Sequence, residues 1–452
     1  MMTITELIMN FGIGIDTDDN DICSCGKVHR ADIKEIIIQE GALSIVPSLV
    51  KKHGGLKAFI IADKNTFMAA GETLCENLSD ENIPFSLYVF DNEDLKPDEF
   101  AVGQLVMHFD TECDFIIAVG SGTLNDIGKV LASITDKPYM IVGTAPSMDG
   151  FASATSSVIR DSIKVSLNTV CPTVIVADLD IMCQAPDQLL QAGIGDMLAK
   201  YISICEWRVS HFISGEYYCE KIAAIVRSAV KKCIEIPNLF SKEPLSIKPL
   251  IEGLIFTGVA MSFAGVSRPA SGMEHYFSHI WDMRELAFNT PATLHGIQCG
   301  TATFLCLRIY EYITSIVPNR QKALDFVNHF SVENWNDFLV QFLGEESAHT
   351  VIELEKKEKK YDLRSHQSRL EAIVEGWDEI VKIISEELPN IEWLENYMAT
   401  VGIPTNPAEL GHPNTEVQHA FLVTKDIRDK YIGSRLLWDL GHINEAMVAV
   451  FS

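Results

Sequence analysis

Five short apolar runs, separated by helical patterns, constrain the fold of this chain more than any other feature. They are rich in β-branched and aromatic residues and read KAFIIAD (57–63), FSLYVF (85–90), DFIIAVG (114–120), YMIVG (139–143) and TVIVA (173–177). Continuously apolar strands are covered on both faces, and strands that alternate with helices run parallel. The first part is therefore predicted to be an α/β domain with a doubly wound, mostly parallel sheet.

Two further changes of pattern define the predicted organisation. Residues 157–168 are expected to form a β-hairpin that turns at Arg160 and Asp161, and from about residue 185 onward the apolar spacing becomes helical,. We therefore expect an α/β domain over 1–184 and an all-α domain over 185–452. The charge-dense stretch 345–369 is predicted to be a solvated helix or a loop,.

Composition excludes several classes of protein. The chain has 452 residues, with 62 acidic against 36 basic side chains and a formal net charge of -26. This charge repels nucleic acid and anionic lipid, so neither is an expected partner. The 11 cysteines are scattered, and those in apolar runs, such as Cys299, are expected to be reduced core thiols,. No signal peptide or spanning helix is indicated, so we expect a cytoplasmic location.

A glycine-bearing turn follows the third apolar run and begins a helix. Residues 120–129 read GSGTLNDIGK, and such a turn lets backbone N–H groups approach a pyrophosphate,. Asn125 stands where the G-x-G-x-x-G fingerprint has its third glycine, so a turn without ligand stays the alternative. The TAPSMDG turn (144–150) follows the next strand and should face the same edge of the sheet,. These two turns predict a nucleotide site.

Three segments of the second part carry residues that bind metals. They are GIGDMLAK (193–200), SGMEHYFSH (271–279) and TLHGIQ (293–298). His275 and His279 are four residues apart, so they share one face of a helix. One carboxylate and two imidazoles are a set that holds a divalent transition metal such as Zn²⁺, although each residue alone could be structural.

The motifs GSGTLND, TAPSMDG, GIGDMLAK, RPASGMEHYFSH and LHGIQ together resemble the bacterial branch of the sn-glycerol-1-phosphate dehydrogenase family. That family belongs to the superfamily of glycerol dehydrogenase, iron-type alcohol dehydrogenases and dehydroquinate synthase. The resemblance implies a dehydroquinate synthase-like fold, with a dinucleotide-binding domain followed by a metal- and substrate-binding domain. It also implies that dihydroxyacetone phosphate is reduced to sn-glycerol 1-phosphate with NAD(H) or NADP(H) and one Zn or Ni ion. A homodimer is expected.

The resemblance also implies roles for individual residues. Hydride would pass to C2 of the substrate while the metal acts as a Lewis acid. The expected metal ligands are Asp196, His275 and His295. The expected cofactor-binding residues are Gly120, Ser121, Gly122, Thr123 and Leu124 (pyrophosphate), and Thr144, Ser147 and Ser153 (nicotinamide side). Asp149 would touch the substrate, and His279 would contact the substrate or relay a proton. Independently of the resemblance, the position of Asp63 at the end of an earlier strand indicates a bond to the adenosine ribose, with a turn residue as the alternative,.

The substrate phosphate needs a cation within this acidic protein. Arg268, Lys200 and Lys164 lie in or near the motifs. We favour Arg268, because a guanidinium can hold phosphate with two hydrogen bonds. A salt bridge or a helix cap is the alternative role for this arginine.

Three other functions are weighed against this one. A glycerol or other polyol dehydrogenase of the same superfamily would act on glycerol rather than on its phosphate. A dehydroquinate synthase-like lyase would need a set of lysines and arginines that the sequence does not show. The Cys23–His29 stretch could form a small metal-binding or redox interaction element, but its C-x-C-x₃-H spacing lacks a second ligand pair nearby and does not by itself support a zinc module,.

Overall fold

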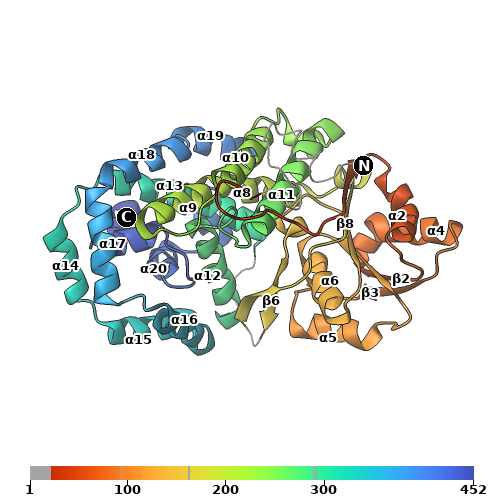
Figure 1. Cartoon of the computed structure of the whole chain (residues 1–452), viewed down its shortest axis with the longest axis horizontal. Coiled ribbons are helices and arrows are strands. Elements are labelled where there is room, and N and C mark those ends of the chain that lie inside the picture. The colour runs from red at the N-terminus through yellow and green to blue at the C-terminus, as the bar shows by residue number, and fades with distance from the viewer. Residues whose placement is uncertain (1–21, 93, 161–162, 289, 291–292, 452) are drawn as a thin grey trace. The chain divides into compact units, whose positions relative to one another are not determined.

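Six parallel strands form the main sheet of the N-terminal part (Figure 1). The structure, a computed structural model, describes residues 22–451 except 93, 161–162, 289 and 291–292. The strands are β1 (Glu35–Gln39), β2 (Ala58–Asp63), β3 (Phe85–Phe90), β4 (Phe115–Gly120), β5 (Tyr139–Gly143) and β8 (Val174–Asp178). They lie in the order β1-β8-β5-β4-β2-β3, and every neighbouring pair is parallel. The predicted parallel sheet is confirmed, with β1 as an additional edge strand.

The predicted hairpin is formed by β6 (Thr155–Arg160) and β7 (Ile163–Asn168). The two strands are antiparallel, with Val158 opposite Val165. Of the two residues expected at the turn, Arg160 ends β6 and Asp161 lies outside the described residues.

Helices cover the main sheet on both faces. In Figure 1, α2 (Val46–Lys52) and α4 (Glu72–Asp80) lie on one side of β2 and β3, and α5 (Glu99–His108) and α6 (Gly122–Thr135) lie on the other. Leu74 and Leu78 of α4 share a fully buried cluster with Ile60 and Ile117 of the central strands. All six residues of β4 are buried, as the apolar pattern of a doubly wound sheet requires,.

By its internal contacts the chain divides into two compact units. The first consists of residues 22–197 and 219–267, and the second of residues 198–218 and 268–451. The expected boundary at residue 184 marks the end of the sheet, whereas three of the helices that follow it belong to the first unit. One reason is close packing within that unit, because a Cβ on Gly258 would lie 2.7 Å from the carbonyl oxygen of Asp149.

The second unit contains helices and no strands among its described residues. The remaining helices of the first unit are α3 (Lys64–Thr66), α7 (Leu179–Met182), α8 (Asp187–Leu198), α10 (Glu220–Ile234) and α11 (Pro244–Ala264). Those of the second unit are α9 (Lys200–Ser214), α12 (Met273–Phe288), α13 (His295–Thr314), α14 (Arg320–Asn328), α15 (Val332–Leu343), α16 (Glu345–Glu358), α17 (Leu363–Glu375), α18 (Trp377–Glu387), α19 (Ile391–Val401), α20 (Asn414–Thr424), α21 (Gly433–Asp439) and α22 (Ile443–Phe451). The charge-dense stretch therefore contributes to two helices, α16 and α17.

Among the described helices, α11 alone has the length and composition of a membrane span. However, 72% of its apolar window is buried inside the protein. Burial of this kind is typical of the core helix of a folded domain.

Candidate active site

The turn after β4 and the turn after β5 are joined by hydrogen bonds. The backbone N–H of Thr144 donates to the carbonyl oxygen of Gly120 at 3.1 Å. The hydroxyl oxygens of Ser121 and Ser147 are 2.5 Å apart, and the Ser121 hydroxyl also lies 3.3 Å from the carbonyl oxygen of Ala145. The two polar turns therefore form one edge at the carboxyl ends of neighbouring strands.

The first turn of α6 presents backbone donors at this edge. Ser121 precedes the helix and makes no side-chain cap bond, and the N–H of Asn125 is the donor to its carbonyl oxygen. The N–H groups of residues 122–124 therefore lie ahead of the first helical hydrogen bond. Gly120 permits this tight entry, because a Cβ there would lie 2.4 Å from Cδ1 of Leu124. Such an arrangement binds phosphate groups.

Helix α6 also anchors the 149–153 turn. The side-chain amide of Asn125 donates to the carbonyl oxygen of Gly150 at 3.0 Å. The buried ammonium group of Lys129 lies 3.3 Å from that oxygen and 3.3 Å from the hydroxyl of Ser153. The hydroxyl of Ser153 itself donates to Gly150 at 3.1 Å. In this structure Ser153 supports the turn, and its contact with a cofactor stays a prediction.

Asp63 caps the short helix α3. Its Oδ1 accepts from the backbone N–H of Thr66 at 2.7 Å, and the Thr66 hydroxyl accepts from the N–H of Asp63 at 3.0 Å. This reciprocal cap is the structural role that a carboxylate after a strand commonly takes. That the other carboxylate oxygen of Asp63 binds a ribose hydroxyl remains a prediction.

Asp149 and Asp196, both in the first unit and both buried, are held together. The backbone N–H of Asp149 donates to Oδ2 of Asp196 at 2.9 Å. Gly193, one turn earlier on α8, makes this approach possible, because a Cβ there would lie 2.0 Å from the carbonyl oxygen of Pro146. The GIGD motif thus combines the glycine that admits close packing with the carboxylate that fixes the Asp149 turn.

The three predicted histidines converge in the second unit. His275 and His279 lie on α12, and His295 is the first residue of α13. The ring centroids of His275 and His295 are 5.1 Å apart, and those of His279 and His295 are 5.9 Å apart. The structure therefore brings the imidazoles together as the motifs predict. Asp196 belongs to the other unit.

Hydrogen bonds indicate which ring nitrogen of His275 and of His295 carries the proton. Nδ1 of His275 lies 2.8 Å from the carboxylate of Glu274, to which it donates. The Ser278 hydroxyl donates to the amide oxygen of Gln298 at 2.6 Å, so its oxygen accepts from Nδ1 of His295 at 2.7 Å. In both rings the lone pair is then on Nε2. Histidines that bind metals are oriented by partners of this kind.

A cysteine joins the two histidines. Ligand atoms of His275, His295 and Cys299 all lie within 4.8 Å of one another, and Sγ of Cys299 is 3.6 Å from Nε2 of His295. Cys299 was expected to be a core thiol, and it is fully buried. The signal in the sequence that would have found it is its spacing, because a residue four positions after His295 lies on the same face of a helix.

Two buried carboxylates support the start of α12. Burial raises the pKa of both Glu206 and Glu274 to about 7. Glu274 accepts from the backbone N–H of Gly272 at 2.7 Å, and Glu206 accepts from that of Met273 at 2.8 Å. A side chain at residue 272 would collide with both carboxylates, because its Cβ would lie 2.5 Å from Glu206 and 2.8 Å from Glu274. These two acids therefore set the position of the backbone before His275.

Arg268 is buried and paired with a carboxylate. Its Nε and Nη2 donate to the two carboxylate oxygens of Glu216, at 2.7 and 2.5 Å. Its Nη1 is buried and has no hydrogen-bond partner among the described residues. Lys200, the neighbouring candidate, donates to the carbonyl oxygen of Ala270 at 3.0 Å. The salt-bridge alternative is thus present, and a phosphate contact of Arg268 stays a prediction that would use Nη1.

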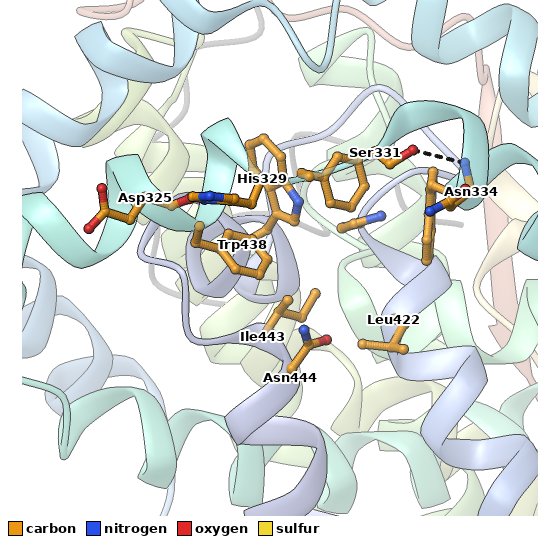
Figure 2. Close-up of a pocket in the computed structure, with 12 residues that line it drawn as sticks. Asp325, His329, Ser331, Asn334, Leu422, Trp438, Ile443 and Asn444 are labelled. Carbon is orange, nitrogen blue, oxygen red and sulfur yellow. Dashed lines mark hydrogen bonds between the residues drawn. The ribbon is translucent and has the colours of Figure 1, made fainter.

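A separate cavity of about 550 Å³ opens in the second unit (Figure 2). Its wall includes Trp438, Ile443 and Leu422, and the ammonium group of Lys425 lies 3.2 Å from the centre of the Trp335 ring. None of its lining residues belongs to the predicted site. We therefore assign the cavity no part in the reaction.

Comparison with known proteins identifies relatives over most of the chain. The iron-containing alcohol dehydrogenase family model matches residues 37–186. The chain is 35% identical to the glycerol-1-phosphate dehydrogenase (NAD(P)+) of Halalkalibacterium halodurans over 294 residues, which are 64% of this chain and 74% of that protein. It is 30% identical to the enzyme of the same name from Bacillus subtilis, over 90% of this chain and 91% of that protein.

Solved structures share the fold. The glycerol dehydrogenase of Schizosaccharomyces pombe superposes with a TM-score of 0.60 and 15% identity, over 93% of this chain and 89% of that one. This likeness shows the dehydroquinate synthase-like architecture alone, whereas the sequence relatives extend across both units. The chain belongs to the glycerol-1-phosphate dehydrogenase family.

Proposed function

We propose that this protein catalyses the reversible, NAD(P)H-dependent and metal-dependent reduction of dihydroxyacetone phosphate to sn-glycerol 1-phosphate. The observation that carries the proposal is the pair His275 and His295, whose Nδ1 atoms are both held so that the lone pairs are on Nε2. The relatives that bear this activity in their names match the chain across these residues. Glycerol dehydrogenase activity, the alternative, is supported only by structural neighbours of low sequence identity.

We assign the metal to Asp196, His275 and His295. The two imidazoles are oriented by buried neighbours, and the buried Asp196 is fixed by the backbone of Asp149, so the donor set fits a divalent ion. A metal bound there supplies Lewis-acid polarisation of a carbonyl oxygen. One carboxylate and two imidazoles suit both Zn²⁺ and Ni²⁺.

We assign the dinucleotide to the edge formed by the two joined turns. The backbone N–H groups from Gly120 to Leu124 would hold the pyrophosphate, and Thr144 and Ser147 would line the nicotinamide side, with Ser153 nearby. The nicotinamide supplies the hydride. Asp63 favours NADH, because a carboxylate beside the ribose repels a 2′-phosphate.

Two further residues are assigned to the substrate. Asp149 would contact the reacting end of the substrate, since its backbone is fixed by Asp196. His279 would hold the proton that the new alkoxide oxygen takes up. Its ring stacks on that of His295 and therefore lies beside a proposed metal ligand.

The direct test is a nicotinamide-oxidation assay with chelated protein to which Zn²⁺ or Ni²⁺ is returned. We expect turnover with dihydroxyacetone phosphate, little with dihydroxyacetone, and a product of the 1-phosphate configuration. Faster oxidation of glycerol than of glycerol 1-phosphate would instead establish the polyol dehydrogenase.

Ser278→Ala tests the orientation of His295. The substitution removes the oxygen that accepts the proton of Nδ1 and leaves the ring free to turn. We expect metal affinity to fall by about 10- to 100-fold, as is usual when such a partner is lost. Metal titration followed by activity should show that excess metal restores much of the rate. Unchanged affinity would mean that Ser278 does not position this ligand.

Arg268→Ala tests the assignment of the substrate phosphate. We expect KM for dihydroxyacetone phosphate to rise by about 10-fold or more, in line with the strength of charge-assisted hydrogen bonds, while KM for dihydroxyacetone changes little. Because the substitution also leaves Glu216 without its partner, thermal unfolding should be followed in parallel. Equal changes in both KM values would reduce Arg268 to a structural ion pair.

A cytoplasmic location and a homodimer complete the proposal. None of the described cysteines is joined to another in a disulfide, which supports a reducing compartment,. The homodimer is a prediction that light scattering of the purified protein can check.

A further inference from the structure

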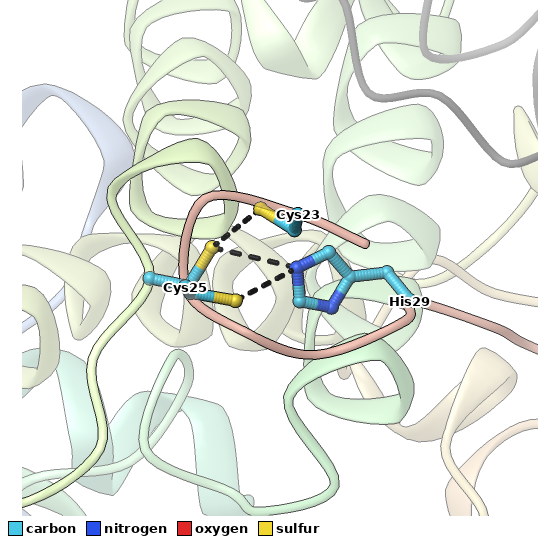
Figure 3. Close-up of side chains that lie close together, drawn as sticks. Cys23, Cys25 and His29 are labelled. Atoms are coloured by element: carbon cyan, nitrogen blue, oxygen red, sulfur yellow. Dashed lines mark hydrogen bonds between the residues drawn. The ribbon is translucent and has the colours of Figure 1, made fainter. Parts of the chain in front are cut away.

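Four side chains of kinds that bind metals lie together in the first unit, and none of them is assigned to catalysis. Cys23, Cys25 and His29 come from the segment that precedes the sheet, and Figure 3 shows them pointing toward one another. Cys219, the residue before α10, completes the group. The ligand atoms of all four lie within 4.8 Å of one another.

Three of the distances within this group match those of a tetrahedral zinc site. Sγ of Cys23 and Sγ of Cys219 are 3.8 Å apart. Nε2 of His29 is 3.4 Å from Sγ of Cys25 and 3.5 Å from Sγ of Cys219. Zinc bonds of about 2.3 Å to sulfur and about 2.0 Å to nitrogen, at tetrahedral angles, separate two sulfurs by about 3.8 Å and a sulfur from a nitrogen by about 3.5 Å.

The imidazole is held in the form that binds a metal. Nδ1 of His29 lies 3.1 Å from the carbonyl oxygen of Phe263, and a carbonyl can only accept. Nδ1 therefore carries the proton, and Nε2 directs its lone pair toward the sulfurs. A backbone carbonyl is one of the usual partners that fix a metal-binding histidine in this way.

The backbone around the first two cysteines is folded into a tight turn. The N–H of Gly26 donates to the carbonyl oxygen of Cys23 at 2.8 Å, and the N–H of Cys23 donates to that of Lys27 at 3.0 Å. Gly26 has a φ of 85°, a conformation that favours glycine,. The turn places Cys23 and Cys25 on the same side, facing His29. Cys219 and His29 are buried, whereas Cys23 and Cys25 are partly exposed.

We propose that Cys23, Cys25, His29 and Cys219 bind a structural Zn²⁺ ion. Four protein ligands with three thiolates leave no open position for a substrate, which is typical of a structural rather than a catalytic zinc. The ion ties the segment before β1 to the start of α10 and, through the bond of His29 to Phe263, to the end of α11. The first three ligands alone did not support a zinc module in the sequence, because they lack a fourth ligand nearby. The fourth ligand, Cys219, follows His29 by 190 residues.

The proposal is tested on the full-length protein with its catalytic ligands removed. In a His275→Ala, His295→Ala double variant, elemental analysis should still find one equivalent of Zn²⁺ per chain. Adding Cys219→Ser should abolish it, whereas Cys75→Ser, at a half-buried thiol of the same unit, should leave it in place. Zinc absent from the double variant, or retained without Cys219, would overturn the proposal. Neither result would alter the proposed dehydrogenase activity.

A second measurement does not depend on the folding of any variant. Treating the unmodified protein with an organomercurial should release one equivalent of Zn²⁺ into a colorimetric chelator, because mercury displaces zinc from thiolates. Mass spectrometry of the alkylated protein should find the three cysteine ligands unoxidised. No release, or a disulfide between Cys23 and Cys219, would refute the zinc site in favour of a redox pair.

Discussion

Replacing His275 with alanine is expected to reduce kcat/KM for dihydroxyacetone phosphate by about 1000-fold or more. The proposed Lewis acid lowers the activation barrier by several kcal/mol, and each 1.36 kcal/mol corresponds to about tenfold in rate. Nε2 of this residue is one of two imidazole nitrogens assigned to the metal, so its loss should remove most bound metal at micromolar concentration. The affinity for NADH should change little, because the turns assigned to the dinucleotide belong to the other unit.

The control for His275→Ala is His349→Ala, at an exposed histidine of α16 in the same unit. Initial rates, metal content and NADH affinity from fluorescence titration should be compared for the two variants. Thermal unfolding should also be measured, because Glu274 loses a partner when His275 is removed. A His275→Ala protein that folds, lacks metal and keeps the rate of the parent would refute the proposed mechanism.

The parallel sheet could be predicted because the sequences of its central strands are continuously apolar. β4 and β5 are buried along their whole length, and a sheet covered on both faces demands this continuous apolar pattern,. β1 was not predicted, although residues 36–38 are three isoleucines. It is a five-residue edge strand that pairs only with β8, the last strand in sequence. The two strands are more than 130 residues apart in sequence, so the local sequence pattern does not indicate their pairing.

The candidate site was predictable where its residues share one element. The four-residue spacing of His275 and His279 indicated a common helix face, and the structure places both rings close to His295. The groups that orient the ligands were not predicted. Ser278 acts on His295 through contact between α12 and α13. Tertiary packing decides such partners, so a single sequence offers only helical spacing as a guide.

Gly193→Ala is expected to be the most damaging conservative substitution in the first unit. Its Cβ would lie 2.0 Å from the carbonyl oxygen of Pro146, and a backbone oxygen cannot move aside as a flexible side chain can. Helix α8 would have to withdraw by about 1 Å, and strain of this kind costs about 1–3 kcal/mol. The withdrawal would also loosen the bond between Asp196 and the N–H of Asp149.

The loss of activity should therefore exceed the loss of stability. A misplacement of about 1 Å can cost about 100-fold in rate, whereas about 2 kcal/mol lowers Tm by only several degrees in a protein of this size. The matched control is Gly103→Ala on α5, where a Cβ meets nothing within 4 Å and alanine should be neutral or slightly stabilising,. Calorimetry measures the loss of stability, and initial rates at saturating metal measure the loss of activity, for both variants. A Gly193→Ala protein with parental kcat and Tm would show that α8 need not lie against the turn that carries Asp149.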